Sequence, residues 1–195
     1  MNTRTTRNRL LTGLTAAVAA GTLALGASPA SASASSGYIS GAGSLFDDFG
    51  DEGTLSTSSY ASSNTTCFWQ RILWAMGANE SAGNDFDLSD IDGHFGAKTK
   101  YATKNLQGAV GLTVDGKVGN KTFGNFDAQR VWNSDLGEYT GRLTKVSTAS
   151  NGTVKVKFTG SAHNFFIYRG PSGRYTFPDG SGTYRDSSYS HNYCD

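Results

Sequence analysis

The same short pattern occurs twice in this chain, at residues 92–99 and again at residues 115–122. Both copies read Asp-Gly-x-apolar-Gly-x-Lys-Thr. In each copy the aspartate can accept hydrogen bonds within a turn, and the glycine can take a positive φ angle at no steric cost. The repeat predicts two copies of one structural unit, each a tight turn that opens into a helix.

The other positions of the pattern predict how each turn is fixed. The apolar residue is expected to be a buried plug, and the second glycine lets two backbone segments approach closely. The threonine falls in the first turn of the following helix, where its hydroxyl can bond to free amide groups. The residues with this structural role are Gly93, Phe95, Gly96, Thr99, Gly116, Val118, Gly119 and Thr122.

Apolar periodicity predicts three helices around the two turns. Between Cys67 and Met76 the apolar side chains recur at intervals of three and four, with residues 64–66 as candidate caps and Gly77 placed to end the helix. The second stripe is weaker and the third is short. The stripes are Trp69, Ile72, Leu73 and Met76, then Tyr101, Ala102, Leu106 and Ala109, and finally Phe123 and Phe126.

With these features the chain resembles the three-helix peptidoglycan-binding domain of secreted bacterial cell-wall proteins and wall hydrolases. The resemblance covers residues 64–127 and rests on CFWQRILWAMG and DIDGHFGAKTKYATKNLQGAVGLTVDGKVGNKTF. The chain departs from the family at Ala97 and Asn120, where proline is frequent, and at Asn79–Ser89, which is longer than usual. The resemblance implies binding of peptidoglycan, through its glycan strands or its stem peptides.

The surface beside the two turns is the candidate binding site, because exposed residues on a rigid scaffold often carry function. Its side chains offer donors, acceptors and one ring. The candidate ligand-binding residues are Asp92, His94, Lys98, Tyr101, Asp115, Lys117 and Lys121.

The start of the chain predicts export. Residues 1–34 combine three arginines, an apolar run over residues 10–25 and small residues before position 34, as a secretory signal peptide does. We expect a secreted protein, extracellular or associated with the cell wall, without a membrane anchor. Removing this segment leaves 14 of the 17 basic side chains and all 16 acidic ones, a net charge of −2, which argues against a nucleic-acid partner.

Two further features concern the connections between parts of the chain. Cys67 and Cys194 are the only cysteines, and an exported chain is expected to pair them, which would fasten the C-terminal region to the helices. Residues 35–63 are rich in Ser, Gly and Thr and are predicted to be a flexible linker. The acidic cluster at residues 47–52 is expected to be a solvated patch.

From Trp132 onward the pattern becomes extended. Short β-type runs at 142–147, 153–158, 165–169 and 174–177 are separated by turn residues and predict a small antiparallel sheet. The fold class is therefore α+β, with a helical domain at 64–130 and a β domain at 131–195. Six tyrosines in this half suit stacking on sugars, although filling a β core is the preferred interpretation. They are Tyr139, Tyr168, Tyr175, Tyr184, Tyr189 and Tyr193.

A non-catalytic binding protein is favoured over an enzyme. The only histidines are His94, His163 and His191, and neither a zinc set, a paired carboxylate site nor a nucleophilic cysteine is recognisable. No catalytic residue, metal or cofactor is expected, and the chain is taken to be a monomer. Two alternatives stay open. One is a secreted protein–protein interaction or inhibitor module, and the other is a peptidoglycan hydrolase that uses His163 or His191 with Asp179 or Asp186.

Overall fold

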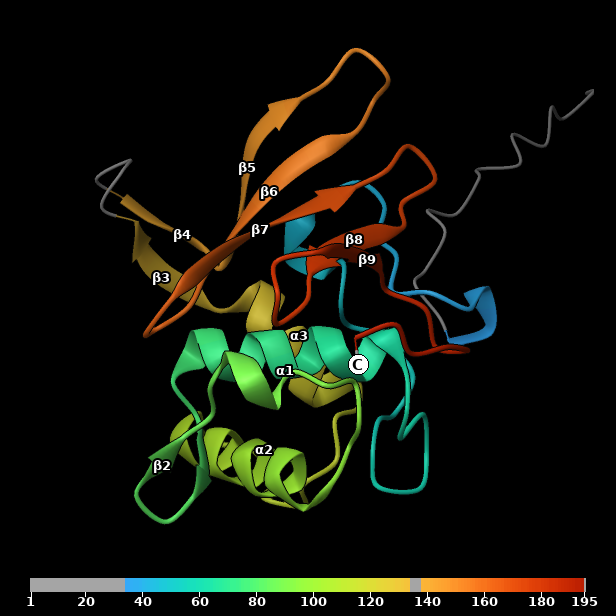
Figure 1. Cartoon of the computed structure of the whole chain (residues 1–195). Helices are drawn as coiled ribbons and strands as arrows, with labels where there is room; N and C mark the ends of the chain where they lie inside the picture. The colour runs from blue at the N-terminus through green and yellow to red at the C-terminus, as the bar shows by residue number, and fades with distance from the viewer. Residues whose placement is uncertain (1–33, 134–137, 195) are drawn as a thin grey trace, which may run out of the picture.

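The structure, a computed structural model, describes residues 34–133 and 138–194. The predicted signal peptide lies outside these residues except for Ala34. Three helices and antiparallel strands form an α+β fold, as the sequence predicts. The helices lie on one side and the main sheet on the other (Figure 1).

Helix α1 (Asn64–Met76) begins and ends for identifiable reasons. The hydroxyl of Ser63 accepts a hydrogen bond from the Thr66 N–H at 3.0 Å, so the N-cap is Ser63 and not one of residues 64–66. Gly77 follows the helix in the left-handed conformation, with φ 67°, as predicted.

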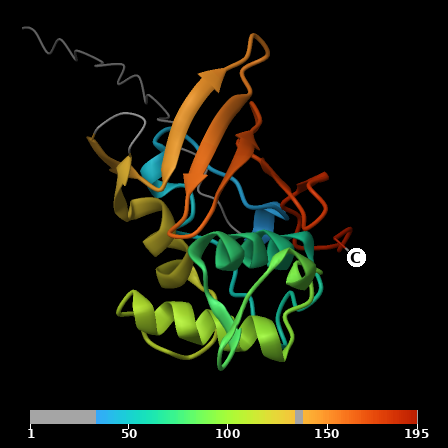
Figure 2. The same cartoon turned by 60° about the vertical axis from the view of Figure 1, so that its left-hand side comes forward.

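Helix α1 is almost entirely buried, because it lies between the other helices and the sheet (Figures 1 and 2). On one side its Trp69 ring packs edge-on against Phe123 and Phe126 of α3 (Asn120–Ala128). On the other side Phe68 packs against Phe165 and Phe177 of the sheet. One continuous apolar core therefore crosses the predicted boundary between the helical and the β region.

Helix α2 (Ala97–Ala109) buries a face that differs from the predicted stripe. Tyr101 is 45 % exposed, and Ala109 is also exposed. The buried face consists of Thr99, Ala102, Thr103, Leu106 and Gln107. Three of these five side chains are polar and hydrogen-bonded inside the protein, so apolar periodicity identified this face poorly.

The helical segment is not all-helical. The long connection between α1 and α2 forms a small hairpin, β1 (Asn79–Ser81) and β2 (Asn84–Asp85), and a 3₁₀ turn, η3 (Leu88–Asp90). This insertion accounts for the extra length at residues 79–89. The three helices are confirmed. Helices α2 and α3 and the sheet all pack around α1, so the helices do not form a separate bundle.

The main sheet is a five-stranded antiparallel meander in the order β5-β6-β7-β8-β9. Its first four strands correspond to the four predicted runs, whereas the edge strand β9 and the hairpin β3–β4 were not predicted. The strands are β3 (Arg130–Asn133), β4 (Glu138–Gly141), β5 (Leu143–Thr148), β6 (Val154–Thr159), β7 (Asn164–Arg169), β8 (Tyr175–Pro178) and β9 (Tyr184–Asp186).

Residues 34–63, named the N-terminal strap here, differ from the flexible linker that their composition predicts. Ile39, Phe49 and Leu55 are each fully buried in the core. A few apolar anchors are enough to order a polar segment when the rest of the chain already builds the core that receives them. An average over composition does not detect such anchors.

The strap also pairs with both repeated turns. Leu55 and Val118 exchange backbone hydrogen bonds of 2.9 and 3.0 Å. The Phe95 N–H donates to the carbonyl of Ala61 at 2.7 Å. Each turn therefore has a strap residue beside its buried plug.

The acidic cluster of the strap is partly buried, and not the solvated patch expected. Asp48 is 1 % exposed and Glu52 is 2 % exposed. The Asp48 carboxylate accepts hydrogen bonds from the Tyr175 hydroxyl and from Arg169, the latter at 2.7 Å. The Glu52 carboxyl group accepts a hydrogen bond from the Tyr189 hydroxyl. These carboxyl groups attach the strap to the sheet and to the C-terminal tail.

A third buried carboxyl group attaches the strap to α3. The Phe49 N–H donates to Asp127 Oδ2 at 2.6 Å. Burial raises the pKa of Asp127 to about 7 and the pKa of Glu52 to about 8. Both groups therefore retain a proton in the folded state at pH values where exposed carboxyl groups are ionised.

The predicted disulfide is present between Cys67 and Cys194, with a Cα–Cα distance of 6.4 Å. Next to it the tail packs on the start of α1, where the N–H groups of Asn64 and Thr65 donate to the carbonyls of His191 and Ser188. The tail is therefore fixed to the central helix both covalently and by hydrogen bonds. Within the described residues, no helix is both long and apolar enough to cross a bilayer.

Replacement of a strap anchor tests whether the strap is part of the core. We expect Phe49→Ala to lower the free energy of unfolding by about 3–5 kcal/mol, because it removes a fully buried ring. The matched control is Phe46→Ala in the same segment, where the ring is 47 % exposed and the loss should stay below about 1 kcal/mol. Urea denaturation measures both, and equal small losses would show that the strap is a linker.

The buried carboxyl groups predict a pH dependence of stability. The unfolded chain releases these protons near pH 4, whereas the folded chain holds them up to about pH 7 and 8. Because the folded state binds more protons in this range, stability should fall as the pH rises from about 5 to about 8, and then level off. Unfolding temperatures across this range should show the decline, and Glu52→Gln should reduce it. A stability that rises over the same range would contradict this assignment.

Candidate functional site

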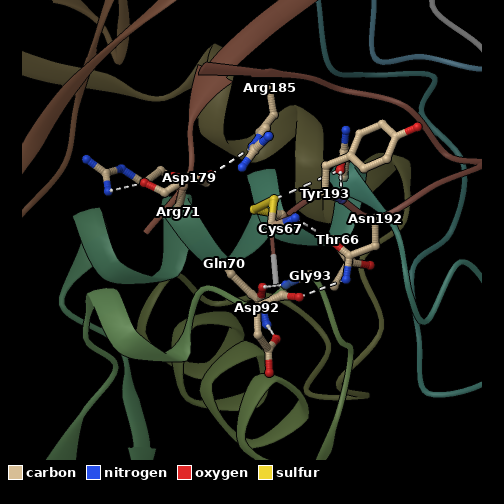
Figure 3. The surroundings of a disulfide bond; sticks show 12 residues. Thr66, Cys67, Gln70, Arg71, Asp92, Gly93, Asp179, Arg185, Asn192 and Tyr193 are labelled. Atoms are coloured by element: carbon tan, nitrogen blue, oxygen red, sulfur yellow. Dashed lines mark hydrogen bonds and ion pairs between the residues drawn. A yellow bond between two sulfur atoms is a disulfide. The ribbon is translucent and has the colours of Figure 1, made fainter. Parts of the chain in front are cut away.

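The first repeated turn closes around a buried glutamine of α1 (Figure 3). The Gln70 Nε2 group donates to Asp92 Oδ1 at 2.8 Å, to the His94 carbonyl at 3.1 Å and to Thr99 Oγ1 at 3.0 Å. Its Oε1 atom accepts the Gly93 N–H at 2.7 Å. One side chain thus holds both ends of the turn.

The second turn repeats this arrangement position for position with Gln107 of α2. The Gln107 Nε2 group donates to Asp115 Oδ1 at 3.0 Å, to the Lys117 carbonyl at 2.8 Å and to Thr122 Oγ1 at 3.2 Å. Its Oε1 atom accepts the Gly116 N–H at 2.9 Å. The glycines after the two aspartates have φ angles of 73° and 71°, as the pattern predicts.

The sequence pattern did not reveal the glutamines as part of the repeat. Each follows an apolar residue in the preceding helix, in Trp69-Gln70 and in Leu106-Gln107. However, Gln70 lies 22 residues before its aspartate and Gln107 only 8, because the β1–β2 hairpin is inserted in the first unit. The unequal spacing concealed the common position.

The threonines of the pattern act differently from the prediction. Thr99 Oγ1 accepts from its glutamine and donates to the His94 carbonyl at 3.2 Å. Thr122 bonds in the same way to Gln107 and to the Lys117 carbonyl. The hydroxyls therefore join the turn to the helix and do not cap its amides.

The first turn is covered by the C-terminal tail. Asn192 Nδ2 donates to the carbonyl of Asp92 at 2.8 Å, and a Cβ atom added at Gly93 would lie 2.1 Å from Asn192 Oδ1 (Figure 3). Ile91, directly before this turn, is only 4 % exposed. The tail that the disulfide fixes to α1 thus lies against the first turn.

The lysine of the first turn is engaged in ion pairs. Lys98 Nζ lies 2.7 Å from Glu80 Oε2 and 2.7 Å from Asp90 Oδ1, and both carboxylates are largely buried. Burial disfavours the charge on Asp90, but hydrogen bonds from Lys98 and from the Asp87 backbone outweigh this effect, so the pKa of Asp90 lies below its ordinary value. Lys98 therefore fastens the hairpin insertion to α2.

The second turn borders a groove of about 720 Å³, named the second-turn groove here. Thr113 stands where the first copy has Asp90, so the position equivalent to one ion-pair partner of Lys98 carries no charge. Val114, the counterpart of the buried Ile91, is 52 % exposed. The groove is lined by Thr54, Gln107, Gly111, Leu112, Thr113, Asp115, Lys117, Gly119, Asn120, Lys121 and Thr122.

The structure brings together three of the seven candidate ligand-binding residues, Asp115, Lys117 and Lys121, in this groove. Burial disfavours the charge on Asp115, but hydrogen bonds from the Lys117 N–H and from Gln107 outweigh it and lower its pKa. Asp115 is thus an ionised part of the turn. The structure does not bring Tyr101 into the groove, although its ring is exposed on α2.

The remaining candidates belong to the first turn. Asp92 uses Oδ1 within the turn, as Asp115 does, and accepts the His94 N–H at 2.8 Å. The side chain of His94 is exposed, as is that of Lys117 at the equivalent position. Together with Lys98, these residues lie on the turn that carries the tail and the hairpin.

Of the residues considered for hydrolysis, His191 and Asp186 meet. His191 Nε2 lies 3.2 Å from Asp186 Oδ1, and Nδ1 lies 3.3 Å from Ser188 Oγ and 3.1 Å from Ser190 Oγ. Asp186 Oδ1 also accepts a hydrogen bond from Asn64 at 2.9 Å. The histidine is therefore bonded within a short segment of the tail.

The other two residues considered for hydrolysis have separate partners. His163 stacks on Trp74 of α1 with ring centroids 4.3 Å apart. Asp179 pairs with Arg185 at 2.8 Å, and its carbonyl accepts from Arg71 (Figure 3). Asp179 thus acts as a link between β9 and α1.

Replacement of either glutamine tests the structural equivalence of the two turns. We expect Gln70→Leu and Gln107→Leu each to lower the free energy of unfolding by roughly 1–3 kcal/mol, because a buried glycine N–H loses its partner. Lys145→Ala on the exposed side of β5, away from both turns, is the control and should change little. If urea denaturation shows both glutamine variants to be as stable as this control, the glutamines do not fix the turns.

Comparisons with known proteins bear on the segment that contains both turns. No curated protein and no solved structure matches the chain. Residues 69–124 match the family described as "Putative peptidoglycan binding domain". The matched range runs from α1 into α3 and contains both turns and both glutamines. Residues 69–124 thus carry the signature of this peptidoglycan-binding family, which confirms the resemblance drawn from the sequence.

Proposed function

We propose that the chain is a secreted, non-catalytic protein that binds peptidoglycan through the second-turn groove. The observation that carries this proposal is the difference between two otherwise equivalent turns. The first is covered by Asn192, which is hydrogen-bonded to it, whereas the second has the flexible side chains of Lys100 and Lys104 beside Gly116 and borders an open groove. A duplicated unit with one covered copy and one open copy suggests that the open copy meets the ligand.

The chemistry of the groove suits a polymer of amino sugars and short peptides. Lys117 and Lys121 present amines, which pair with carboxylates such as those of stem peptides. Thr54, Thr113 and Asn120 offer hydroxyl and amide groups for hydrogen bonds to sugar hydroxyls and peptide groups. Gln107 holds the backbone of the turn beneath these side chains, so the groove is formed before a ligand arrives.

Export is part of the proposal. The signal-peptide pattern of residues 1–34 and the Cys67–Cys194 disulfide both fit an oxidising location outside the cytoplasm. The disulfide also keeps the C-terminal tail on the first turn. Because the tail covers the first turn, the second turn is the one that remains accessible to the cell wall.

Co-sedimentation with insoluble peptidoglycan tests the proposed groove. We expect Lys117→Ala to weaken binding about tenfold, because it removes a charge-assisted contact. His94→Ala changes the equivalent position of the first turn and is the matched control, for which binding should stay near that of the wild type. Equal losses in both variants, or no binding by the wild type, would refute the proposal.

A wall hydrolase is the second candidate, favoured by the contacts of His191. An imidazole between a carboxylate and a serine hydroxyl is an arrangement that can activate a nucleophile. Dye release from labelled cell walls tests it. Activity that His191→Ala abolishes, with an unchanged unfolding temperature, would establish the hydrolase, whereas no release from several wall preparations would eliminate it.

A further inference from the structure

The outer face of the main sheet combines exposed rings with lysines. Strands β6 and β7 direct alternate residues into the core, namely Val156, Phe158, Phe165 and Ile167. The intervening residues form cross-strand pairs on the opposite face, Lys155 with Tyr168 and Lys157 with Phe166. With Tyr184 of β9, these residues define the outer sheet face.

The rings on this face are exposed and held in place. Phe166 is 40 % exposed and Tyr184 is 45 % exposed. The Tyr184 ring lies 5.2 Å from the Tyr168 ring, and its hydroxyl donates to the Phe166 carbonyl at 3.3 Å. Lys155 Nζ lies 4.2 Å from the centre of the Phe166 ring. Neighbouring exposed rings of this kind mark interaction surfaces, whereas single exposed apolar residues do not.

The charge of this region differs from that of the rest of the chain. Residues 142–178 contain no aspartate or glutamate, although the sequence after residue 34 has a net charge of −2. The lysines of the segment all lie on strands of the sheet, at Lys145, Lys155 and Lys157. The hairpin β5–β6 that carries them extends away from the helices (Figures 1 and 2). Strands β5–β8 therefore carry basic side chains and no acidic ones, whereas the edge strand β9 ends with Asp186.

We propose that the outer sheet face is a second binding site, which takes an acidic polysaccharide. Flat aromatic rings offer apolar faces to the C–H faces of sugar rings, and lysines pair with anionic substituents on the same polymer. A second copy of this chain fits poorly, because a symmetric contact would place lysines against lysines. The site is separate from the second-turn groove and does not depend on it.

Affinity electrophoresis in native gels tests this site with polygalacturonate as the acidic polysaccharide and dextran as the neutral one. The mature protein should be retarded by polygalacturonate and not by dextran, and less so as salt is raised. We expect Phe166→Ala combined with Tyr184→Ala, and separately Lys155→Gln combined with Lys157→Gln, to weaken the retardation at least about tenfold.

Two control variants distinguish this face from the rest of the surface. Tyr193→Ala removes a ring that is 58 % exposed on the tail, and Lys100→Gln with Lys104→Gln removes the same charge from α2. Both should remain retarded, and circular dichroism should show that every variant is folded at the temperature of the gel. No retardation of the wild type, equal losses in the controls, tighter binding of single-stranded DNA, or a dimer that Phe166→Ala disrupts would each overturn the proposal.

Discussion

One buried glutamine amide fixes each of the two turns on which the helical region depends. The amide is suited to this position because it offers two N–H donors and a carbonyl acceptor on one side chain, which can bridge separate backbone segments. A helix supplies the glutamine, and the turn then supplies the first residues of the next helix. The order α1, turn, α2, turn, α3 therefore contains the same helix-to-turn connection twice. Loss of either glutamine would leave buried peptide groups of that turn without partners.

The two turns differ in function because different segments pack against them. The first receives the disulfide-bound tail and the hairpin insertion, so it joins both of these segments to the helices. The second touches the strap through Val118, has the flexible α2 side chains of Lys100 and Lys104 beside Gly116, and borders a groove. Helix α1 lies beneath the sheet and contributes Trp69 to one side of the core and Phe68 to the other. The helical region, the strap and the sheet therefore stabilise one another.

The sequence predicted the features that depend on neighbouring residues. The periodicity around Trp69 and Ile72 predicts α1, alternation in Val154–Phe158 predicts β6, and the Asp-Gly pairs predict turns with positive φ. The disulfide could be predicted because the sequence contains only two cysteines. The predicted ligand-binding residues included those that line the second-turn groove. They also included first-turn residues that make structural contacts.

The features that were not predicted depend on contacts between distant parts of the chain. Phe49 became ordered by a bond to Asp127, 78 residues away, and Asp48 by a bond to Tyr175, 127 residues away. The buried face of α2 is polar and has the residue types of an exposed face. Its polar groups are satisfied by distant residues, as Thr99 is by Gln70. Asn192 lies 100 residues from the turn that it covers, so local patterns could not separate the covered turn from the open one.

The most direct test of this account is NMR chemical-shift mapping of the isotope-labelled mature protein with soluble peptidoglycan fragments. The account predicts that the largest shifts fall on residues 111–122 and on Thr54, while residues 92–99 change little. Shifts concentrated on residues 92–99, or no shifts on either turn at saturating fragment concentration, would contradict the claim that the open second turn is the surface that binds the wall.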